Sequence, residues 1–114
     1  MKNKLIFIIF LFILSLFTIN NVSATFPLMG KLIVIDPGHG GLDPGTSVGK
    51  IYEKDLNLEI SKELEIELSK LGSTVVLTRS DDNDISSPGA NYRKRSDFDN
   101  RINLINSLKP DLYL

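Results

Sequence analysis

Apolar and polar positions divide the chain into a leading apolar segment and a longer section in which strand-like and helix-like patterns alternate. Residues 31–35 form a continuous and partly β-branched apolar run, which predicts a strand covered on both faces. Residues 74–78 repeat this pattern, and residues 111–114 begin a third run of the same kind. We therefore expect three strands in this section of the chain.

Two segments between these runs have helical spacing. Over residues 55–71, leucine and isoleucine recur every three or four positions, which predicts an amphipathic helix with Asp55 as N-cap and Gly72 just beyond its end. A second stripe predicts a helix from about residue 97 to 108, which Pro110 ends. The order β-α-β-α-β predicts an α/β fold with a mostly parallel sheet, flanking helices and functional loops at the carboxyl ends of the strands.

The beginning of the chain has the pattern of an export signal. Two early lysines precede an almost unbroken apolar run at residues 5–19, and residues 22–24 (Val-Ser-Ala) match a signal-peptidase site. As a helix this run would be about 22 Å long, shorter than the ~30 Å hydrocarbon core of a bilayer. We expect residues 1–24 to be a cleaved secretory signal, with an uncleaved anchor as the alternative. Residues 25–114 would then form a secreted or extracytoplasmic domain that meets the membrane only through this segment.

Composition narrows the function classes. The 114 residues carry a formal net charge of −1, and residues 25–114 hold 11 basic against 14 acidic side chains. This balance argues against nucleic-acid binding, because phosphate contacts need a clustered surplus of lysine and arginine. The chain has no cysteine, so a metal, a partner or further chain must take the place that disulfides have in many small domains.

A glycine-rich loop at residues 37–54 follows the first predicted strand, where open α/β sheets place their ligands. Two phosphate-binding patterns fail there. A dinucleotide fingerprint counted from Gly38 needs glycine where Asp43 stands, and a Walker loop needs four residues between its glycines, whereas Gly45 and Gly49 have three between them. A nucleotide-binding domain is therefore nearly excluded.

A metal site is the better candidate for this loop. His39 is the only histidine of the chain, and Glu53 follows it at the return of the loop, just before the predicted helix. Imidazole and carboxylate suit Zn²⁺, and a catalytic zinc site commonly has three protein ligands and a water molecule. From the residues alone, a surface histidine in a flexible loop remains the simpler interpretation.

Residues 31–114 resemble the front half of the zinc-dependent N-acetylmuramoyl-L-alanine amidases, the peptidoglycan amidase_3 family. The most specific block is residues 35–41 (Ile-Asp-Pro-Gly-His-Gly-Gly). The other matching segments are residues 43–45, 52–55, 77–79, 101–106 and 111–114. Residues 26–31 and 88–95 further resemble the germination-specific branch of the family in endospore-forming bacteria, which takes part in making muramic-δ-lactam in the spore cortex.

This resemblance implies a function and a partial site. His39 and Glu53 would be the first two ligands of Zn²⁺, and the reaction would cleave the amide bond between N-acetylmuramic acid and L-alanine in peptidoglycan. The third ligand, a histidine in a Ser-Ile-His motif, and the catalytic glutamate would follow Leu114. We therefore expect residues 25–114 to be about the first half of the family fold, without a catalytic residue of their own and inactive alone. A non-catalytic remnant or wall-binding module is the alternative, and a partner lipoprotein is a further expectation.

Four other charged features have competing interpretations. Asp36 is expected to cap the loop backbone, with orientation of a ligand histidine as the alternative. Arg79 is expected to form a structural ion pair with Asp82 rather than to clamp substrate. Residues 93–95 (Arg-Lys-Arg) are expected to form a solvated loop face, with binding to an anionic wall polymer or a partner as the alternative. Residues 81–84 are acidic but lack the spacing of a calcium-binding EF-hand.

Overall fold

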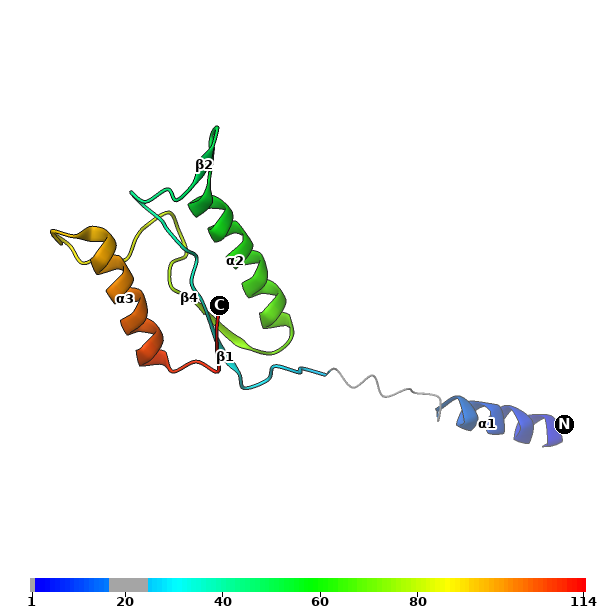
Figure 1. The fold of residues 1–114 in the computed structure, drawn as a ribbon. Helices are drawn as coiled ribbons and strands as arrows, with labels where there is room; N and C mark the ends of the chain where they lie inside the picture. The colour runs from blue at the N-terminus through cyan, green and yellow to red at the C-terminus, as the bar shows by residue number, and fades with distance from the viewer. Residues whose placement is uncertain (1, 17–24) are drawn as a thin grey trace.

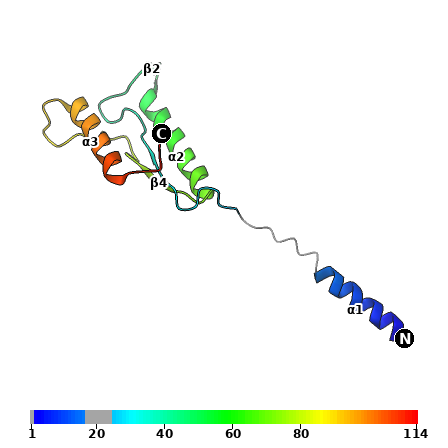
Figure 2. The same ribbon diagram turned by 60° about the horizontal axis from the view of Figure 1, so that its bottom comes forward.

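The computed structural model describes residues 2–16 and 25–114 of the chain. Figures 1 and 2 show a small sheet with a helix on either side, and a first helix that lies apart from them. In chain order the elements are α1 (Lys2–Leu16), β1 (Leu32–Ile35), β2 (Ser47–Val48), β3 (Ile51–Tyr52), α2 (Glu53–Lys70), β4 (Thr74–Leu77), α3 (Arg93–Leu108) and β5 (Leu112–Tyr113).

The sheet has the strand order β4-β1-β5, and both pairs are parallel. Leu32 of β1 lies opposite Thr74 of β4, and Ile33 lies opposite Leu112 of β5. Residues 33–35 in the central strand are the buried apolar core, because strands on both edges and helices on both faces shield them. The predicted α/β fold with a parallel sheet and flanking helices is confirmed.

Helix α2 begins at Glu53, two residues before the predicted start. Asp55 is therefore not the N-cap: Tyr52 holds that position and makes no side-chain capping hydrogen bond. The carboxylates of Glu53 and Asp55 instead lie in the first turn, where their negative charge interacts favourably with the positive end of the helix dipole. The predicted end is right, since Gly72 follows the C-cap residue with a φ of +95°.

Helix α3 begins at Arg93, four residues before the predicted start at Asp97. Periodicity missed its first turn because residues 93–96 are all polar and carry no apolar stripe. Asp97 does not cap the helix. Its carboxylate accepts hydrogen bonds from the Ile85 backbone and from Arg101, at 2.7 and 2.8 Å. The hairpin formed by β2 and β3 within the glycine-rich loop was not predicted either.

Only part of the apolar stripe on α2 is covered within the described residues. Ser61 faces inward and is buried, whereas Leu56 and Ile60 are 47% and 64% exposed. Ile60 lines an open groove together with Leu64 and Leu114, at the edge of the sheet formed by β5. The predicted spacing of the stripe is correct, but its burial is incomplete because α2 packs mainly against β4.

The leading apolar segment forms α1, whose described apolar side chains are exposed. Among the residues that the structure describes, no helix combines the length and apolarity needed to cross a bilayer. The signal-peptidase pattern at residues 22–24 lies outside the described residues. The assignment of residues 1–24 as signal or anchor therefore stays a prediction.

Asp111 fastens the edge strand β5 to the central strand β1. Its carboxylate accepts hydrogen bonds from the Leu32 backbone at 2.8 Å and from the Lys31 ammonium at 2.9 Å. These two hydrogen bonds, the backbone one first, hold the pKa of Asp111 below its ordinary value. A carboxylate whose pKa is lowered by folding stabilises the folded state at pH values above its unfolded-state pKa. This stabilisation is lost as the pH falls through the folded-state pKa.

We predict that Asp111→Asn lowers the urea midpoint of unfolding at pH 7, because the charge-assisted bonds to Lys31 and Leu32 are weakened. The difference from the unsubstituted chain should shrink as the pH falls below about 4, where an unfolded aspartate is protonated. Urea titrations followed by circular dichroism at pH 7 and pH 3 measure both quantities. A difference of the same size at the two pH values would contradict this role of Asp111.

Candidate functional site

The glycine-rich loop leaves the carboxyl end of β1 and carries His39 in a left-handed backbone conformation, with a φ of +64°. This conformation costs roughly 1–2 kcal/mol for a residue with a Cβ atom, so the surrounding structure must hold it. It is held by hydrogen bonds to the backbone carbonyls of the loop.

Two buried arginines, Arg79 and Arg101, supply most of these hydrogen bonds, and we call them the arginine clamp. Arg79 follows β4 and donates to the carbonyl oxygens of Pro37 and Gly38 at 2.8 and 3.0 Å. Arg101 lies on α3 and donates to those of Pro37 and His39 at 2.9 and 2.8 Å. The carbonyl oxygens of residues 37–39 are thus held by one arginine that follows β4 and one on α3.

Asp36, the residue after β1, anchors the clamp. Its carboxylate pairs with Arg101 at 2.5 Å, and it accepts hydrogen bonds from the hydroxyls of Thr78 and Tyr113. The expectation that Asp36 caps the loop backbone is wrong, because its carboxylate bonds to these three side chains instead. Its orientation of a ligand histidine stays a prediction. Burial lowers the pKa of Arg101, but the carboxylates of Asp97 and Asp36 outweigh it and raise that pKa.

Arg79 is structural, as predicted, but its partners differ from the prediction. It donates to carbonyl oxygens, including those of Lys54 and Asp81 at 2.9 Å, rather than to the Asp82 carboxylate. Asp82 pairs instead with the Lys54 ammonium at 2.6 Å. Burial, and then the nearby charge of Arg101, lower the pKa of Arg79. Its side chain also fastens the first turn of α2 to the loop.

His39 and Glu53, the two candidate donors, lie together at the mouth of the loop. The Nε2 atom of the imidazole is 3.4 Å from Oε1 of Glu53, the first residue of α2. Oε2 of Glu53 accepts a hydrogen bond from the Thr46 backbone at 2.8 Å. This bond is the main cause of a pKa below the ordinary value for Glu53, and His39 lowers it further.

Gly45 lets the two side chains approach. It has a φ of +65°, and a Cβ atom there would lie 2.7 Å from Cδ2 of His39 and 2.7 Å from Oε2 of Glu53. Both distances are too short for carbon and oxygen in van der Waals contact, so a side chain at this position would push His39 and Glu53 apart. The glycine is needed for space as well as for its backbone angle.

Asp43 is the site residue that the sequence reasoning missed. Its Oδ2 atom lies 3.1 Å from Nδ1 of His39, on the side of the ring opposite to Glu53. The hydrogen bond with His39, and then those from Lys94 and Gly45, lower the pKa of Asp43 from 3.8 to about 2. The sequence signal that could have identified Asp43 is its position four residues after the histidine, in the same tight loop.

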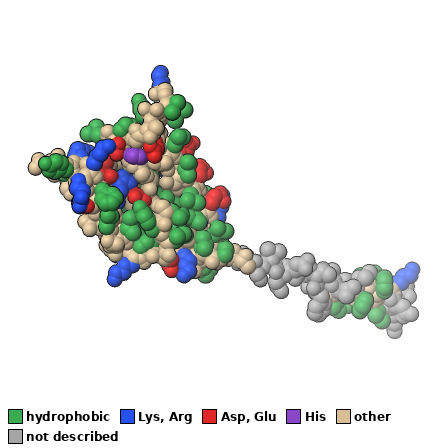
Figure 3. Space-filling model, in the orientation of Figure 1, with side chains coloured by type: hydrophobic (Ala, Val, Ile, Leu, Met, Phe, Trp, Pro, Cys, Tyr) green, Lys and Arg blue, Asp and Glu red, His purple; other side chains and the backbone are tan. Residues whose placement is uncertain are grey.

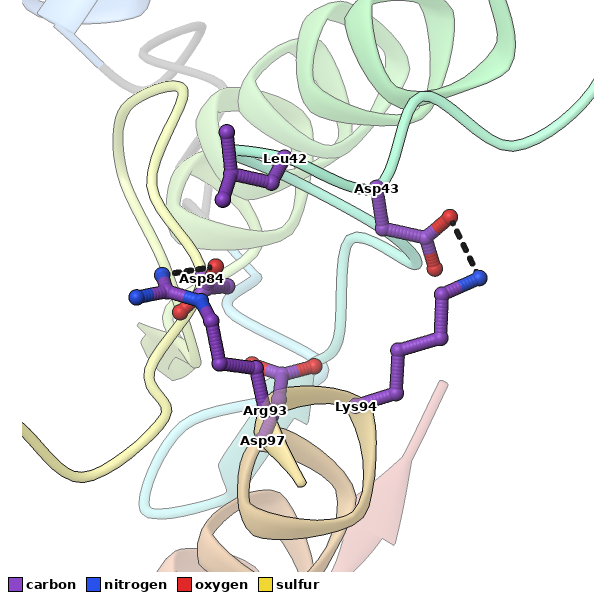
Figure 4. A pocket seen from close by; sticks show the side chains of 6 residues that line it. All are labelled: Leu42, Asp43, Asp84, Arg93, Lys94 and Asp97. Carbon is purple, nitrogen blue, oxygen red and sulfur yellow. Dashed lines mark hydrogen bonds and ion pairs between the residues drawn. The ribbon is translucent and has the colours of Figure 1, made fainter. Parts of the chain in front are cut away.

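Residues 93–95 are exposed to solvent, as expected, but they form the first turn of α3 rather than a loop, and each has an acidic partner. Figure 4 shows Arg93 reaching Asp84 and Lys94 reaching Asp43, at 2.6 and 3.0 Å. Arg95 pairs with Asp99 at 3.0 Å. In Figure 3 the histidine is visible at the surface, beside acidic and basic side chains. Asp84 is thus engaged by both Arg93 and Ser86.

The chemistry of His39 and Glu53 fits two of the donors of a zinc site, an imidazole nitrogen and a carboxylate oxygen that face each other. No group of three or more histidine, cysteine or acidic side chains in residues 2–16 and 25–114 is arranged to hold a metal ion. The described part of the chain therefore offers a pair of donors, and their metal role stays a prediction.

The sheet and the glycine-rich loop lie within a segment that matches a known protein family. The model of the Amidase_3 family, described as N-acetylmuramoyl-L-alanine amidase, matches residues 33–114, and the chain belongs to this family. The resemblance of residues 31–114 is thereby confirmed.

Two curated relatives and a solved structure show the extent of the similarity. The germination-specific N-acetylmuramoyl-L-alanine amidase of Bacillus subtilis is 40% identical over 114 aligned positions, covering 95% of this chain and 48% of the relative. The probable cell wall amidase LytH of Staphylococcus aureus is 49% identical over 70 positions, covering 59% of this chain and 24% of that protein. The chain spans half or less of the length of both.

Among solved structures, the CwlD amidase of Clostridioides difficile, in complex with the GerS lipoprotein, superimposes with a TM-score of 0.69 at 31% identity. The match covers 73% of this chain and 45% of that one. The fold described above is therefore that of part of an Amidase_3 domain.

We predict that Arg101→Met destabilises the chain by about 3–5 kcal/mol, because it leaves Asp36 buried without its cation and removes two donors from the loop carbonyls. Arg95→Met, on the exposed face of the same helix, should change stability by about 0.5 kcal/mol or less. Urea unfolding of both variants measures the contrast. Equal midpoints for the two would show that the clamp does not hold the fold.

Proposed function

We propose that His39 and Glu53 supply two of the zinc ligands of an N-acetylmuramoyl-L-alanine amidase, which hydrolyses the bond between N-acetylmuramic acid and L-alanine in peptidoglycan. The observation that carries this proposal is the approach of Nε2 of His39 to Oε1 of Glu53, at 3.4 Å, across a glycine that leaves no room for a side chain. Membership of the Amidase_3 family supports the same reaction.

In this proposal His39 and Glu53 bind and orient, and neither carries the proton. His39 and Glu53 would hold the zinc, which would supply a lowered pKa for a water molecule and polarisation of the amide carbonyl. The clamp holds the backbone of His39, and the Thr46 amide holds one oxygen of Glu53 so that the other faces the imidazole. Both donors are therefore positioned before any metal binds, which reduces the ordering that binding requires.

We extend the proposal to the setting of the reaction. The Bacillus relative is named germination-specific, and the CwlD structure contains the GerS lipoprotein. For this chain we propose a role in spore cortex maturation, with formation of muramic-δ-lactam, and a lipoprotein partner. The site of action would be the cell wall or the space between the forespore membranes, after export directed by residues 1–24.

We predict that the 114-residue chain alone releases no stem peptide from purified peptidoglycan, even with zinc added. Two donors do not hold Zn²⁺ in the geometry of a catalytic site, which commonly has three protein ligands and a water molecule. Appearance of new N-terminal alanine, followed by amino-group labelling over hours, is the measurement. Steady turnover by the isolated chain would contradict this part of the proposal.

The metal role itself is tested by zinc titration of matched glycine variants. We predict that Gly45→Ala weakens zinc binding by about tenfold or more, because the added methyl group separates His39 from Glu53. Gly49→Ala is the control, since Gly49 has a similar φ of +62° and open space around it. Both variants carry the same backbone strain, so only the lost approach of the donors distinguishes them.

Competition with a chromophoric chelator gives the two affinities, and His39→Ala should abolish the binding. Equal zinc affinity of Gly45→Ala and Gly49→Ala, or binding that survives His39→Ala, would overturn the assignment of these donors.

A further inference from the structure

We propose that Asp43 is a positioning residue: it holds the His39 ring in the tautomer protonated on Nδ1, so that Nε2 presents its lone pair beside Glu53. The functional meaning of this inference rests on the proposed role of His39 as a metal donor. Asp43 itself has no role in that proposal. The set of bonds that fix Asp43 relative to the ring is the basis of the inference.

The backbone places Asp43 beside the histidine. Gly40, the next residue after His39, and Asp43 exchange two backbone hydrogen bonds of 3.0 Å each and form an isolated antiparallel bridge. His39 itself cannot shift, because Arg101 holds its carbonyl oxygen at 2.8 Å. The carboxylate and the imidazole are therefore brought together by a closed turn of four residues and not by chance contact of two flexible side chains.

The two oxygens of the Asp43 carboxylate have different partners. Oδ2 lies 3.1 Å from Nδ1 of His39, whereas Oδ1 pairs with the Lys94 ammonium at 3.0 Å. Figure 4 shows Lys94 extending from α3 to this oxygen. A rotation that took Oδ2 away from the ring would also break the pair with Lys94. The carboxylate thus has one preferred orientation, with an acceptor directed at Nδ1.

An ionised carboxylate accepts hydrogen bonds and donates none, so its partner nitrogen must carry the proton. In a neutral imidazole the other nitrogen then has no proton. Here that nitrogen is Nε2, and its neighbour Glu53 Oε1 is also an acceptor, 3.4 Å away. A lone pair and a carboxylate oxygen that face each other without a proton between them form a pair suited to a cation.

The competing arrangement puts the proton on Nε2 and directs it at Glu53. The distances argue against it, because 3.1 Å at Nδ1 is within hydrogen-bond range and 3.4 Å at Nε2 is beyond it. Glu53 also has a closer partner for its other oxygen, the Thr46 amide at 2.8 Å. Asp43 is therefore the stronger acceptor for the single imidazole proton.

The test is nuclear magnetic resonance of metal-free chain labelled with ¹⁵N in histidine, at the alkaline plateau where the ring shifts stop changing. Since His39 is the only histidine, both ring nitrogens belong to one residue, and their different couplings to the ring protons Hδ2 and Hε1 distinguish Nδ1 from Nε2. We expect a protonated Nδ1 and an unprotonated Nε2. Protonation of Nε2 in the unsubstituted chain would overturn the inference without any variant.

Three variants sharpen the test. Asp43→Leu should shift the ring toward the Nε2-protonated tautomer, and Asp43→Asn should keep the original tautomer because the amide oxygen accepts the same hydrogen bond. Asp99→Leu is the matched control: it removes an aspartate paired with Arg95 on α3, away from the ring. An unchanged tautomer in folded Asp43→Leu would count against the inference.

Zinc titration of the same samples separates this inference from the proposed function. Asp43→Leu should weaken zinc binding 10- to 100-fold, the usual effect of removing the partner of a ligating histidine, and Asp99→Leu should leave it unchanged. If the tautomer is as expected but zinc does not bind through His39, the proposed function fails and the positioning by Asp43 stands. If zinc binds through His39 while metal-free Nε2 carries the proton, the positioning role is wrong.

Discussion

The buried ion pair between Asp36 and Arg101 links the end of β1 to α3 and, through the guanidinium, to the carbonyls of the glycine-rich loop. The side chains are 14% and 7% exposed, and burial of two charges costs several kcal/mol unless their remaining hydrogen-bonding groups are satisfied. Here Thr78 and Tyr113 satisfy Asp36, and loop carbonyls satisfy the guanidinium. Within the described parts of the chain, no buried side-chain polar atom lacks a hydrogen-bond partner. The pair therefore joins β1, β4, β5 and α3 at one point.

The same ion pair also fixes the backbone geometry of the candidate site. Arg101 and Arg79 hold the carbonyls of residues 37–39, and this contact keeps His39 in a backbone conformation that an L-residue otherwise disfavours. Arg79 also bonds to the Lys54 carbonyl in the first turn of α2, so it fixes the helix that carries Glu53 relative to the loop that carries His39. Fold stability and donor geometry are thus two consequences of one network.

Periodicity was sufficient to predict the three strands and the cores of two helices, because burial imposes a repeat of two or 3.6 residues on apolar side chains. It missed the first turn of α3, whose residues are polar, and it placed the start of α2 two residues late. The donors His39 and Glu53 were named from a family resemblance, since a lone histidine and a distant glutamate have no periodic signature. Asp43 and the clamp were missed for a common reason: their partners are a ring nitrogen and backbone carbonyls, and neither leaves a pattern of residue types.

We propose that this network pre-forms half of a metal site from His39 and Glu53. X-ray absorption spectroscopy at the zinc edge of the zinc-loaded chain tests it most directly, because the imidazole ring has a distinctive multiple-scattering pattern. We expect one imidazole nitrogen at about 2.0–2.1 Å, with carboxylate and water oxygens completing the shell. A spectrum with oxygen scatterers alone and no imidazole contribution would contradict it.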